Sequence, residues 1–272
     1  MSEDQDEVSI YCSLDHSSIN DEGENTIVFI HGAFGDGSGW KDVVSHFKDQ
    51  HLLLPDLPAH GVARHLDRFS VPRASRLLRE LIVRKAHGGK AKVVGFSLGA
   101  QVAVHLCSTY PEVIDETVFV SGYGGPSSPT ESPRRFLPYA AWMSQRVEYA
   151  LPRGLIRYMM DGADMPRGDL SQHTLSLYRD IFTPEIKTDW PEPWPARTLI
   201  VVAGKGDLIP SADNPNVAKR LASIGQKGNV STLAVTHPLM RHPWLLQDPE
   251  LFARAVMAWF ERAEIVDGFI KL

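Results

Sequence analysis

Apolar residues gather in short runs along this chain, and longer segments with helical spacing separate the runs. Each run is rich in β-branched residues and is apolar almost throughout. Strands that are apolar on both faces are typical of a parallel sheet with both sides covered. We expect buried strands at 26–31, 51–57, 91–96, 116–121, 198–203 and 229–235, with a weaker edge strand at 8–14 followed by a loop over 15–25.

The segments between the runs repeat apolar residues at intervals of three and four, as an amphipathic helix does. In 70–86, for example, Leu77, Leu78 and Leu81 fall on one stripe. Asp248 is the predicted N-cap of the last helix, with Pro249 at its first position. Strands that alternate with helices predict an α/β fold, with a mostly parallel twisted sheet and helices on both faces. The expected helices are 40–47, 70–86, 98–110, 212–224 and 249–264.

The alternation stops after the fourth strong strand. Residues 122–133 are rich in Gly, Pro and Ser, and the next sixty or so residues contain helical pieces, many aromatic residues and methionines, and no convincing strand. We therefore predict two parts: a core at 1–123 and 196–272, and a helical cap inserted at 124–195 over the carboxyl ends of the strands.

Composition and charge narrow the possible partners. The chain has 272 residues, of which 43% are apolar and 22% charged, a balance typical of a soluble globular protein. The net charge of −5 disfavours binding to nucleic acid. Every apolar run is far shorter than the roughly 20 residues that span a bilayer. The sequence thus favours a small-molecule substrate, without nucleic acid and without a membrane span.

The amino-terminal residues and the cysteines bear on location and cofactors. The first seven residues are acidic and lack the basic region of a secretory signal, so we expect a cytoplasmic location. Cys12 and Cys107 lie far apart and outside any metal-binding spacing, which favours two buried thiols. No motif for a metal or an organic cofactor is present, and we expect none.

The strongest chemical signal is the sequence Gly95-Phe96-Ser97-Leu98-Gly99, between a predicted strand and a predicted helix. A G-x-S-x-G sequence in that context is typical of a nucleophile elbow, a tight turn that exposes the serine hydroxyl above the sheet. Side chains at the two glycine positions would collide with the neighbouring strand and helix. The turn also places Ser97 at a helix N-terminus, where the helix dipole favours a developing negative charge.

With this elbow, the chain resembles the α/β-hydrolase superfamily over nearly its whole length. An upstream His31-Gly32 with Trp40 after it, and the turn from Asp56 to Gly61, precede the elbow in the family's order, although Ala59 stands where the family usually has glycine. The resemblance implies a serine hydrolase whose oxyanion hole is formed by the backbone N–H groups of Ala33 and Leu98. His31 is expected to hold the loop in place and not to react.

The family's order along the chain is serine, then acid, then histidine. The loop after strand 198–203 resembles the family's acid loop, which implies that Asp207 is the acid. Asp213 is the better candidate for the cap of the next helix. Both His237 and His242 follow the last strand; the family's spacing before the final helix favours His242 and leaves His237 as the alternative. Arg241 replaces the glycine that usually precedes this histidine.

These features predict a cofactor-independent hydrolase that cleaves a carboxylic ester or lactone of a small, fairly apolar molecule through an acyl-enzyme on Ser97. Three alternatives stay open: a carbon–carbon bond hydrolase acting on a diketone, a lyase or acyltransferase with the same triad, and a non-catalytic ligand receptor. Dehalogenase and the usual epoxide-hydrolase chemistry are disfavoured, because those relatives carry Asp in place of Ser97. Candidate substrate contacts, which packing of the cap could equally explain, are Phe34, Tyr123, Trp142, Met143 and Tyr158.

Overall fold

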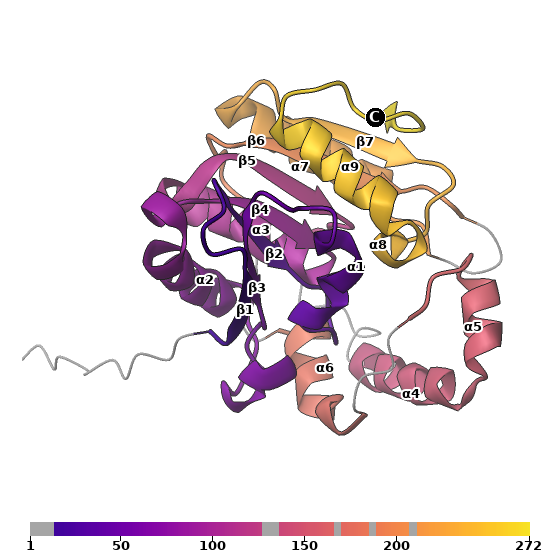
Figure 1. Ribbon diagram of the computed structural model, residues 1–272. Coiled ribbons are helices and arrows are strands. Elements are labelled where there is room, and N and C mark those ends of the chain that lie inside the picture. Colours follow the sequence, from indigo (N-terminus) through magenta and orange to yellow (C-terminus); the bar gives the residue numbers. More distant parts are fainter. Residues whose placement is uncertain (1–13, 127–135, 166–169, 185–188, 207–210) are drawn as a thin grey trace, which may run out of the picture.

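The computed structural model describes residues 14–126, 136–165, 170–184, 189–206 and 211–272. In these residues eight strands form one sheet in the order β1-β3-β2-β4-β5-β6-β7-β8 (Figure 1). The two edge strands pair antiparallel with their neighbours and the remaining pairs are parallel, which confirms the predicted mostly parallel sheet. The strands are β1 (His16–Ile19), β2 (Thr26–Ile30), β3 (His51–Pro55), β4 (Ala91–Phe96), β5 (Ile114–Ser121), β6 (Arg197–Ala203), β7 (Leu233–His237) and β8 (Ile270–Lys271).

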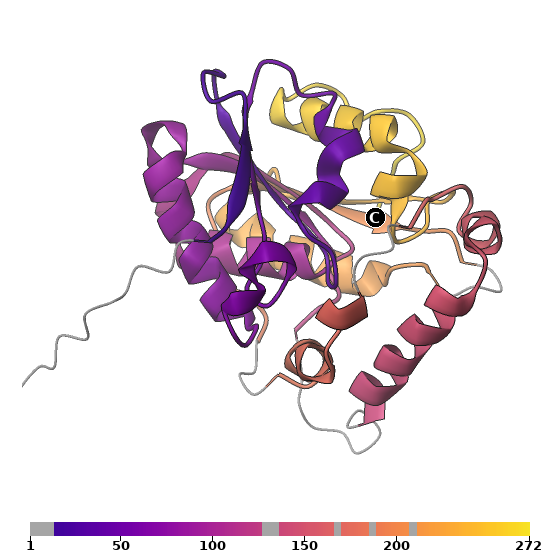
Figure 2. The ribbon, with the colours of Figure 1, turned by 60° about the horizontal axis from the view of Figure 1, so that its bottom comes forward.

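Helices cover both faces of the sheet (Figures 1 and 2). The helices α2, α3 and α7 pack on one face, and α1 and α9 pack on the other. Asp248 caps α9 as predicted, because its carboxylate accepts a hydrogen bond of 2.9 Å from the N–H of Leu251. These helices are α1 (Lys41–Val44), α2 (Val71–Lys85), α3 (Leu98–Thr109), α7 (Pro215–Gly228) and α9 (Pro249–Phe260), with the short α8 (Trp244–Gln247) before α9.

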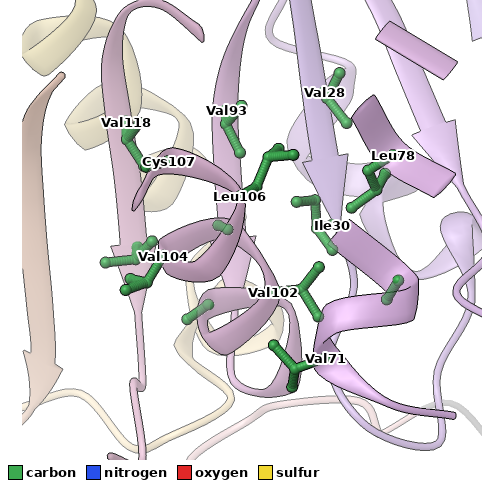
Figure 3. Close-up of a cluster of buried hydrophobic side chains, with 14 of the residues drawn as sticks. Val28, Ile30, Val71, Leu78, Val93, Val102, Val104, Leu106, Cys107 and Val118 are labelled. Carbon is green, nitrogen blue, oxygen red and sulfur yellow. The ribbon is translucent and has the colours of Figure 1, made fainter. Parts of the chain in front are cut away.

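The hydrophobic core lies in two layers, one on each side of the sheet. Val93 and Val94 are adjacent in β4 and both fully buried, but they belong to different layers because successive side chains of a strand point to opposite faces. Figure 3 shows the layer between the strands and helices α2 and α3. Cys107 lies within it, and burial raises the pKa of its thiol. Cys12 lies outside the described residues.

The edge strand β1 lies where the sequence predicted a loop. Most of the expected strand 8–14 falls outside the described residues, and β1 lies in 16–19, within a stretch expected to be a loop. This strand is polar and mostly exposed, so it lacks the hydrophobic pattern from which a strand is predicted. It forms because its backbone pairs antiparallel with β3, with Ser17 opposite Leu54. The helix expected at 40–47 is also shorter, since α1 ends at Val44.

The described residues between β5 and β6 include three α-helices: α4 (Leu137–Ala150), α5 (Arg153–Met159) and α6 (Leu175–Phe182). The described residues of this region contain no strand. We call 136–184 the helical insertion. Figures 1 and 2 show it beside one end of the sheet, with α6 against the core and α4 and α5 farther out. The limits 124–195 and the separate cap domain remain predictions.

The order of the strands reverses at β2, which has β3 on one side and β4 on the other. In open α/β sheets a crevice forms at such a point, outside the carboxyl ends of the strands. The loop after β2 and the Ser97 turn after β4 meet there. Among the helices of the described residues, none is long and apolar enough to cross a bilayer.

Candidate active site

Ser97 occupies a strained turn between β4 and α3. Its φ of 55° lies in the left-handed region, which residues other than glycine rarely adopt. A Cβ on Gly95 would lie 2.6 Å from the carbonyl oxygen of Gly99, and a Cβ on Gly99 would lie 2.2 Å from that of Ile30. Both glycines are therefore required by close backbone contacts, as the sequence predicted. The Ser97 N–H also donates to the Ser121 carbonyl at 2.8 Å, which ties the turn to β5.

The side chain of His242 contacts Ser97 on one side and Asp213 on the other. Its Nε2 lies 2.9 Å from the Ser97 Oγ, and its Nδ1 lies 2.5 Å from the Asp213 Oδ1. A carboxylate oxygen only accepts hydrogen bonds, so this geometry assigns the ring proton to Nδ1. Nε2 is then free to accept the proton of the Ser97 hydroxyl. Serine, imidazole and carboxylate form one continuous hydrogen-bonded line.

Backbone contacts fix both ends of this line. The Asp213 Oδ2 accepts from the N–H of Ala203 at 2.9 Å, and the Asp213 N–H donates to the Ala203 carbonyl at 2.9 Å, so Asp213 is held against the end of β6. The His242 N–H donates to the Ser211 carbonyl at 2.7 Å. Gly122 gives the imidazole its space, because a Cβ there would lie 2.6 Å from the His242 Cε1.

Of the two candidate histidines, only His242 contacts Ser97. His237 is buried against Phe269, with ring centroids 5.0 Å apart, and burial lowers its pKa. Gly268 also packs closely on this ring, because a Cβ there would lie 2.5 Å from the His237 Nε2. The carboxyl-terminal segment therefore encloses the His237 side chain.

Asp207 lies outside the described residues, and the carboxylate that contacts His242 is that of Asp213. The expectation that Asp213 caps the next helix was wrong, because the cap of α7 is Asn214, whose side chain accepts from the N–H of Asn216 at 2.9 Å. The sequence offered two aspartates in one loop, and the run Asp213-Asn214-Pro215 reads as a helix start whichever residue is the cap. The structure describes only Asp213 of the two, and its carboxylate is held by the N–H of Ala203.

The loop after β2 passes directly over Ser97. A Cβ on Gly32 would lie 3.3 Å from the Ser97 Cβ. His31 holds this loop: its Nδ1 donates to the Gly32 carbonyl at 2.7 Å and its Nε2 accepts from the Leu57 N–H at 2.9 Å. Burial lowers the pKa of His31, which keeps the ring in the neutral form that this pair of bonds requires.

The two residues whose backbone N–H groups are expected to form an oxyanion hole, Ala33 and Leu98, lie in the loop after β2 and at the start of α3. Ala33 follows Gly32 in the loop and lines the cavity described below. Leu98 is the first residue of α3, where a backbone N–H has no partner within the helix. Their role as an oxyanion hole remains a prediction.

A cavity of about 480 Å³ opens at Ser97 and His242, within the range of small-molecule sites. Core residues such as Trp40 and Leu246 line one side, and Gln145, Glu148 and Met160 of the helical insertion line the other. Gln145 and Glu148 are three residues apart and share one face of α4. That shared face was visible in the sequence, but nothing marked it as the one that meets the crevice. Among the described residues that line the cavity, none is Lys or Arg.

The five candidate substrate contacts have different positions. Phe34 lines the cavity, and its ring stacks on Tyr178 of α6 with centroids 4.1 Å apart. Tyr123 is buried in the core. Trp142 donates its indole N–H at 3.1 Å to the carbonyl of His173, a residue that lines the cavity and that sequence reasoning missed. The remaining two, Met143 and Tyr158, have side chains 52% and 84% exposed and do not line the cavity.

A serine on a strand–turn–helix elbow, aligned with an imidazole and a carboxylate at the edge of a mostly parallel sheet, defines the hydrolase class of α/β folds. The chain belongs to the alpha/beta hydrolase family, whose sequence model matches residues 27–255. Among the described residues, no cluster of three or more His, Cys, Asp or Glu side chains is placed to bind a metal ion.

Three individual proteins illustrate what the chain resembles. An AB hydrolase superfamily protein of Gibberella zeae is 34% identical over 256 residues, covering 93% of this chain and 86% of that protein. A 2-succinyl-6-hydroxy-2,4-cyclohexadiene-1-carboxylate synthase of Pectobacterium atrosepticum is 28% identical over 130 residues, 47% of this chain and 51% of the synthase. The structure of a thermophilic esterase from Thermogutta terrifontis superposes with a TM-score of 0.68 at 17% identity, covering 92% of this chain and 93% of the esterase, a likeness of fold.

Proposed function

We propose that this protein is a serine hydrolase that cleaves a carboxylic ester or lactone of a small, fairly apolar molecule, with Ser97 as nucleophile, His242 as general base and Asp213 as the orienting acid. One observation carries the proposal: the His242 ring bridges the Ser97 hydroxyl and the Asp213 carboxylate, at 2.9 Å and 2.5 Å. Family membership and the esterase fold of a structural neighbour agree with hydrolysis.

In the first half of the reaction, the Ser97 Oγ attacks the substrate carbonyl carbon while the His242 Nε2 takes the hydroxyl proton. The imidazolium that forms keeps its Nδ1 proton in the hydrogen bond with Asp213, which stabilises the new positive charge. The carbonyl oxygen becomes an oxyanion that the N–H groups of Ala33 and Leu98 stabilise. Collapse of this intermediate breaks the ester C–O bond, and His242 returns the proton to the departing alkoxide.

In the second half, water replaces the alcohol. The His242 Nε2 removes a proton from the water as its oxygen attacks the acyl carbon, and the same N–H groups stabilise the second oxyanion. Collapse breaks the bond to the Ser97 Oγ, which regains its proton from His242. The products are a carboxylic acid and, for a lactone, a hydroxyl group on the same molecule.

The lining of the cavity favours an uncharged substrate. Glu148 and Asp36 contribute carboxylates to it, and no Lys or Arg among its described residues offers a partner for an anionic group. A buried carboxylate without a charged partner is unfavourable, whereas an apolar acyl chain gains from contact with residues such as Leu246. We therefore expect neutral esters to react faster than esters with an anionic acyl chain.

Labelling with a fluorophosphonate probe tests the nucleophile. The wild-type protein should be labelled, and the Ser97→Ala variant should remain unlabelled while keeping its folded far-UV circular dichroism spectrum. Turnover of p-nitrophenyl butyrate should fall by about 10⁴-fold or more in this variant, because a triad acts as a unit. Absence of labelling in the folded wild type would overturn the proposal in favour of a ligand receptor.

Paired substitutions identify the acid. Asp213→Asn should lower kcat about 10³- to 10⁴-fold, because an amide no longer holds the required His242 tautomer. Asp207→Asn is the matched control, from the same loop with the same change, and should retain kcat within about tenfold of wild type. The opposite result would assign the acid role to Asp207, as the resemblance alone implied.

The similarity to a synthase favours one second candidate, lyase chemistry with the same triad. The compound in that protein's name carries a carboxylate, for which the described cavity residues provide no cation. A comparison of p-nitrophenyl butyrate with p-nitrophenyl hemisuccinate, with lactones and β-diketones assayed alongside, separates the two candidates. Preference for the neutral ester supports the hydrolase. Hydrolysis of the hemisuccinate alone would show that the cavity accepts an anionic acyl chain and would remove the argument against the second candidate, and cleavage of a diketone would indicate carbon–carbon bond hydrolysis instead.

A further inference from the structure

The carboxylate of Asp161 lies between two cations that come from the two loops of the triad. Asp161 follows α5 in the helical insertion. Its Oδ2 lies 2.7 Å from the Nζ of Lys205, which follows β6 on the loop that leads to Asp213. The same oxygen accepts a short hydrogen bond from the Nε of Arg241, the residue immediately before His242.

The Asp161 side chain projects from a tight turn after α5. Asp161 has a φ of 51° and Gly162 a φ of 91°, so the chain reverses within these residues. The N–H of Gly162 donates to the Arg157 carbonyl at 2.8 Å and closes the helix end. Among residues other than glycine, Asn and Asp adopt this left-handed conformation most readily. An Asp161→Asn change therefore removes the negative charge while leaving a side chain that suits the same backbone.

Both cations are joined to the groups that hold the triad. The side chain of Arg241 is 4% exposed, and its Nη1 donates to the Ser211 Oγ at 3.2 Å. The carbonyl of Ser211 accepts the His242 N–H, as described above. The backbone N–H of Lys205 donates to the Met240 carbonyl at 2.9 Å. The Asp161 carboxylate pairs with the buried Arg241 guanidinium and so offsets the cost of burying its charge.

We propose that Asp161 is a positioning residue that clamps the Asp213 loop to the His242 loop and makes the order of the triad depend on the docked helical insertion. The Asp161 carboxylate is the common partner of the two loops, and it belongs to neither of them. The inference rests on the proposed function for its catalytic consequence. The effect of the clamp on the position of His242 is structural, and it can be measured with or without turnover. The hydrogen bond from Lys205 and that from Arg241 lower the pKa of the Asp161 carboxyl, in agreement with a charged clamp.

The test compares Asp161→Asn with Asp164→Asn. Asp164 lies in the same part of the insertion and also pairs with a cation, but its partner, Arg153 at 2.9 Å, belongs to the insertion itself. The two variants lose the same charge, and only the first loses a link to the triad loops. In Asp161→Asn, kcat for p-nitrophenyl butyrate should fall about 10- to 100-fold with little change in KM, because small misplacements of a catalytic group have effects of this size. Asp164→Asn should match wild type.

A second measurement does not need turnover. The proton on the His242 Nδ1, in its short bond with Asp213, should give a downfield proton NMR resonance that is absent from His242→Gln. We expect this resonance to broaden or disappear in Asp161→Asn, through exchange with water, and to persist in Asp164→Asn. Lys205→Met removes one arm of the clamp and should weaken the resonance to a smaller extent.

The outcomes separate the two proposals. If Asp161→Asn keeps a kcat near that of wild type and an unchanged resonance, the clamp is overturned. Equal losses of kcat and of the resonance in Asp161→Asn and Asp164→Asn also overturn it, because they indicate a general effect of charge. If wild type is neither labelled nor active, the proposed function fails, and the resonance alone decides whether Asp161 positions His242.

Discussion

Every residue of β2 and β3 is buried, whereas α4 buries only Pro138 and α5 buries none of its residues. The sheet is packed on both faces, so a side chain of these strands is buried whichever face it points to. The outer helices of the insertion contact the rest of the molecule along one side, and their other side chains, such as Met143 and Tyr158, are largely exposed.

The two regions contribute different residues to the candidate site. Ser97, His242 and Asp213 lie on loops of the sheet, where dense packing holds a strained turn in place. Gln145, Glu148 and Met160, which line the far side of the cavity, come from the insertion. The insertion should therefore tolerate substitutions that the core does not, and substrate preference can change there at little cost in stability.

The largest expected effect is that of Gly99→Ala in the core. The new Cβ would lie 2.2 Å from the Ile30 carbonyl oxygen and 2.6 Å from that of His31, and both are backbone atoms of β2 and its end. Since neither can move without opening the sheet, we expect a loss of more than about 4 kcal/mol in the free energy of unfolding. Urea denaturation followed by circular dichroism measures it, and a midpoint equal to that of wild type would contradict a rigid core.

Truncation of the same residue type in the two regions gives the next largest difference. Phe119 in β5 is fully buried against Phe252, with ring centroids 5.3 Å apart, whereas Phe136 before α4 is 58% exposed. Phe119→Ala should destabilise the protein by about 3–5 kcal/mol, because it leaves a cavity. Phe136→Ala, the matched control, should cost less than about 1 kcal/mol. Similar losses in urea denaturation would mean that the insertion is packed as tightly as the sheet.

Acid should weaken the core through His60. Burial, with a smaller contribution from the nearby His31, lowers the pKa of His60 to about 3. The unfolded chain, with a pKa of about 6.5 for this group, then binds more protons than the folded chain between those values. Stability is therefore complete above about pH 6.5 and is lost as the pH falls, by about 2 kcal/mol between pH 7 and pH 5.

A His60→Gln variant should lose this part of the pH dependence of the free energy of unfolding, measured by urea denaturation at each pH. His46→Gln is the control, because it makes the same change at an exposed histidine. If wild type and His60→Gln show parallel pH profiles, His60 is not the group that makes the core sensitive to acid.

Sequence patterns predicted the parts of the molecule that local rules determine. The strand 91–96 and the helix after it agree with β4 and α3 almost residue for residue, because burial on both faces and the G-x-S-x-G glycines leave a strong local signal. The edge strand β1 was missed because it is polar and is held by pairing with β3 alone. The contact between Asp213 and His242 was not predicted, because Asp213 is held in place by a tertiary contact with Ala203 that spacing along the chain does not encode.

The insertion was the hardest region to interpret for a related reason. Its apolar residues repeat at helical intervals, but periodicity gives a face and not the partner of that face. Tyr158 and Met143 looked like pocket residues and point largely to solvent, whereas the polar pair Gln145 and Glu148 lines the cavity. Arg241, which the sequence marked only as a departure from glycine, contacts Asp161 across the boundary with the insertion.

The smallest expected effect, and the one with the opposite sign, is that of Gly154→Ala in α5. A Cβ at Gly154 would meet no atom within 4 Å, and its backbone is helical, so alanine should stabilise the insertion by about 0.4–1 kcal/mol. If the insertion unfolds together with the sheet, the gain appears in the global urea transition. If it opens by itself, hydrogen exchange of the α5 amides slows while the global midpoint is unchanged. If Gly154→Ala is instead less stable than wild type, α5 is packed more closely than its exposure indicates. Alanine would then be unfavourable at both Gly99 and Gly154, and the two regions would not differ in packing as described.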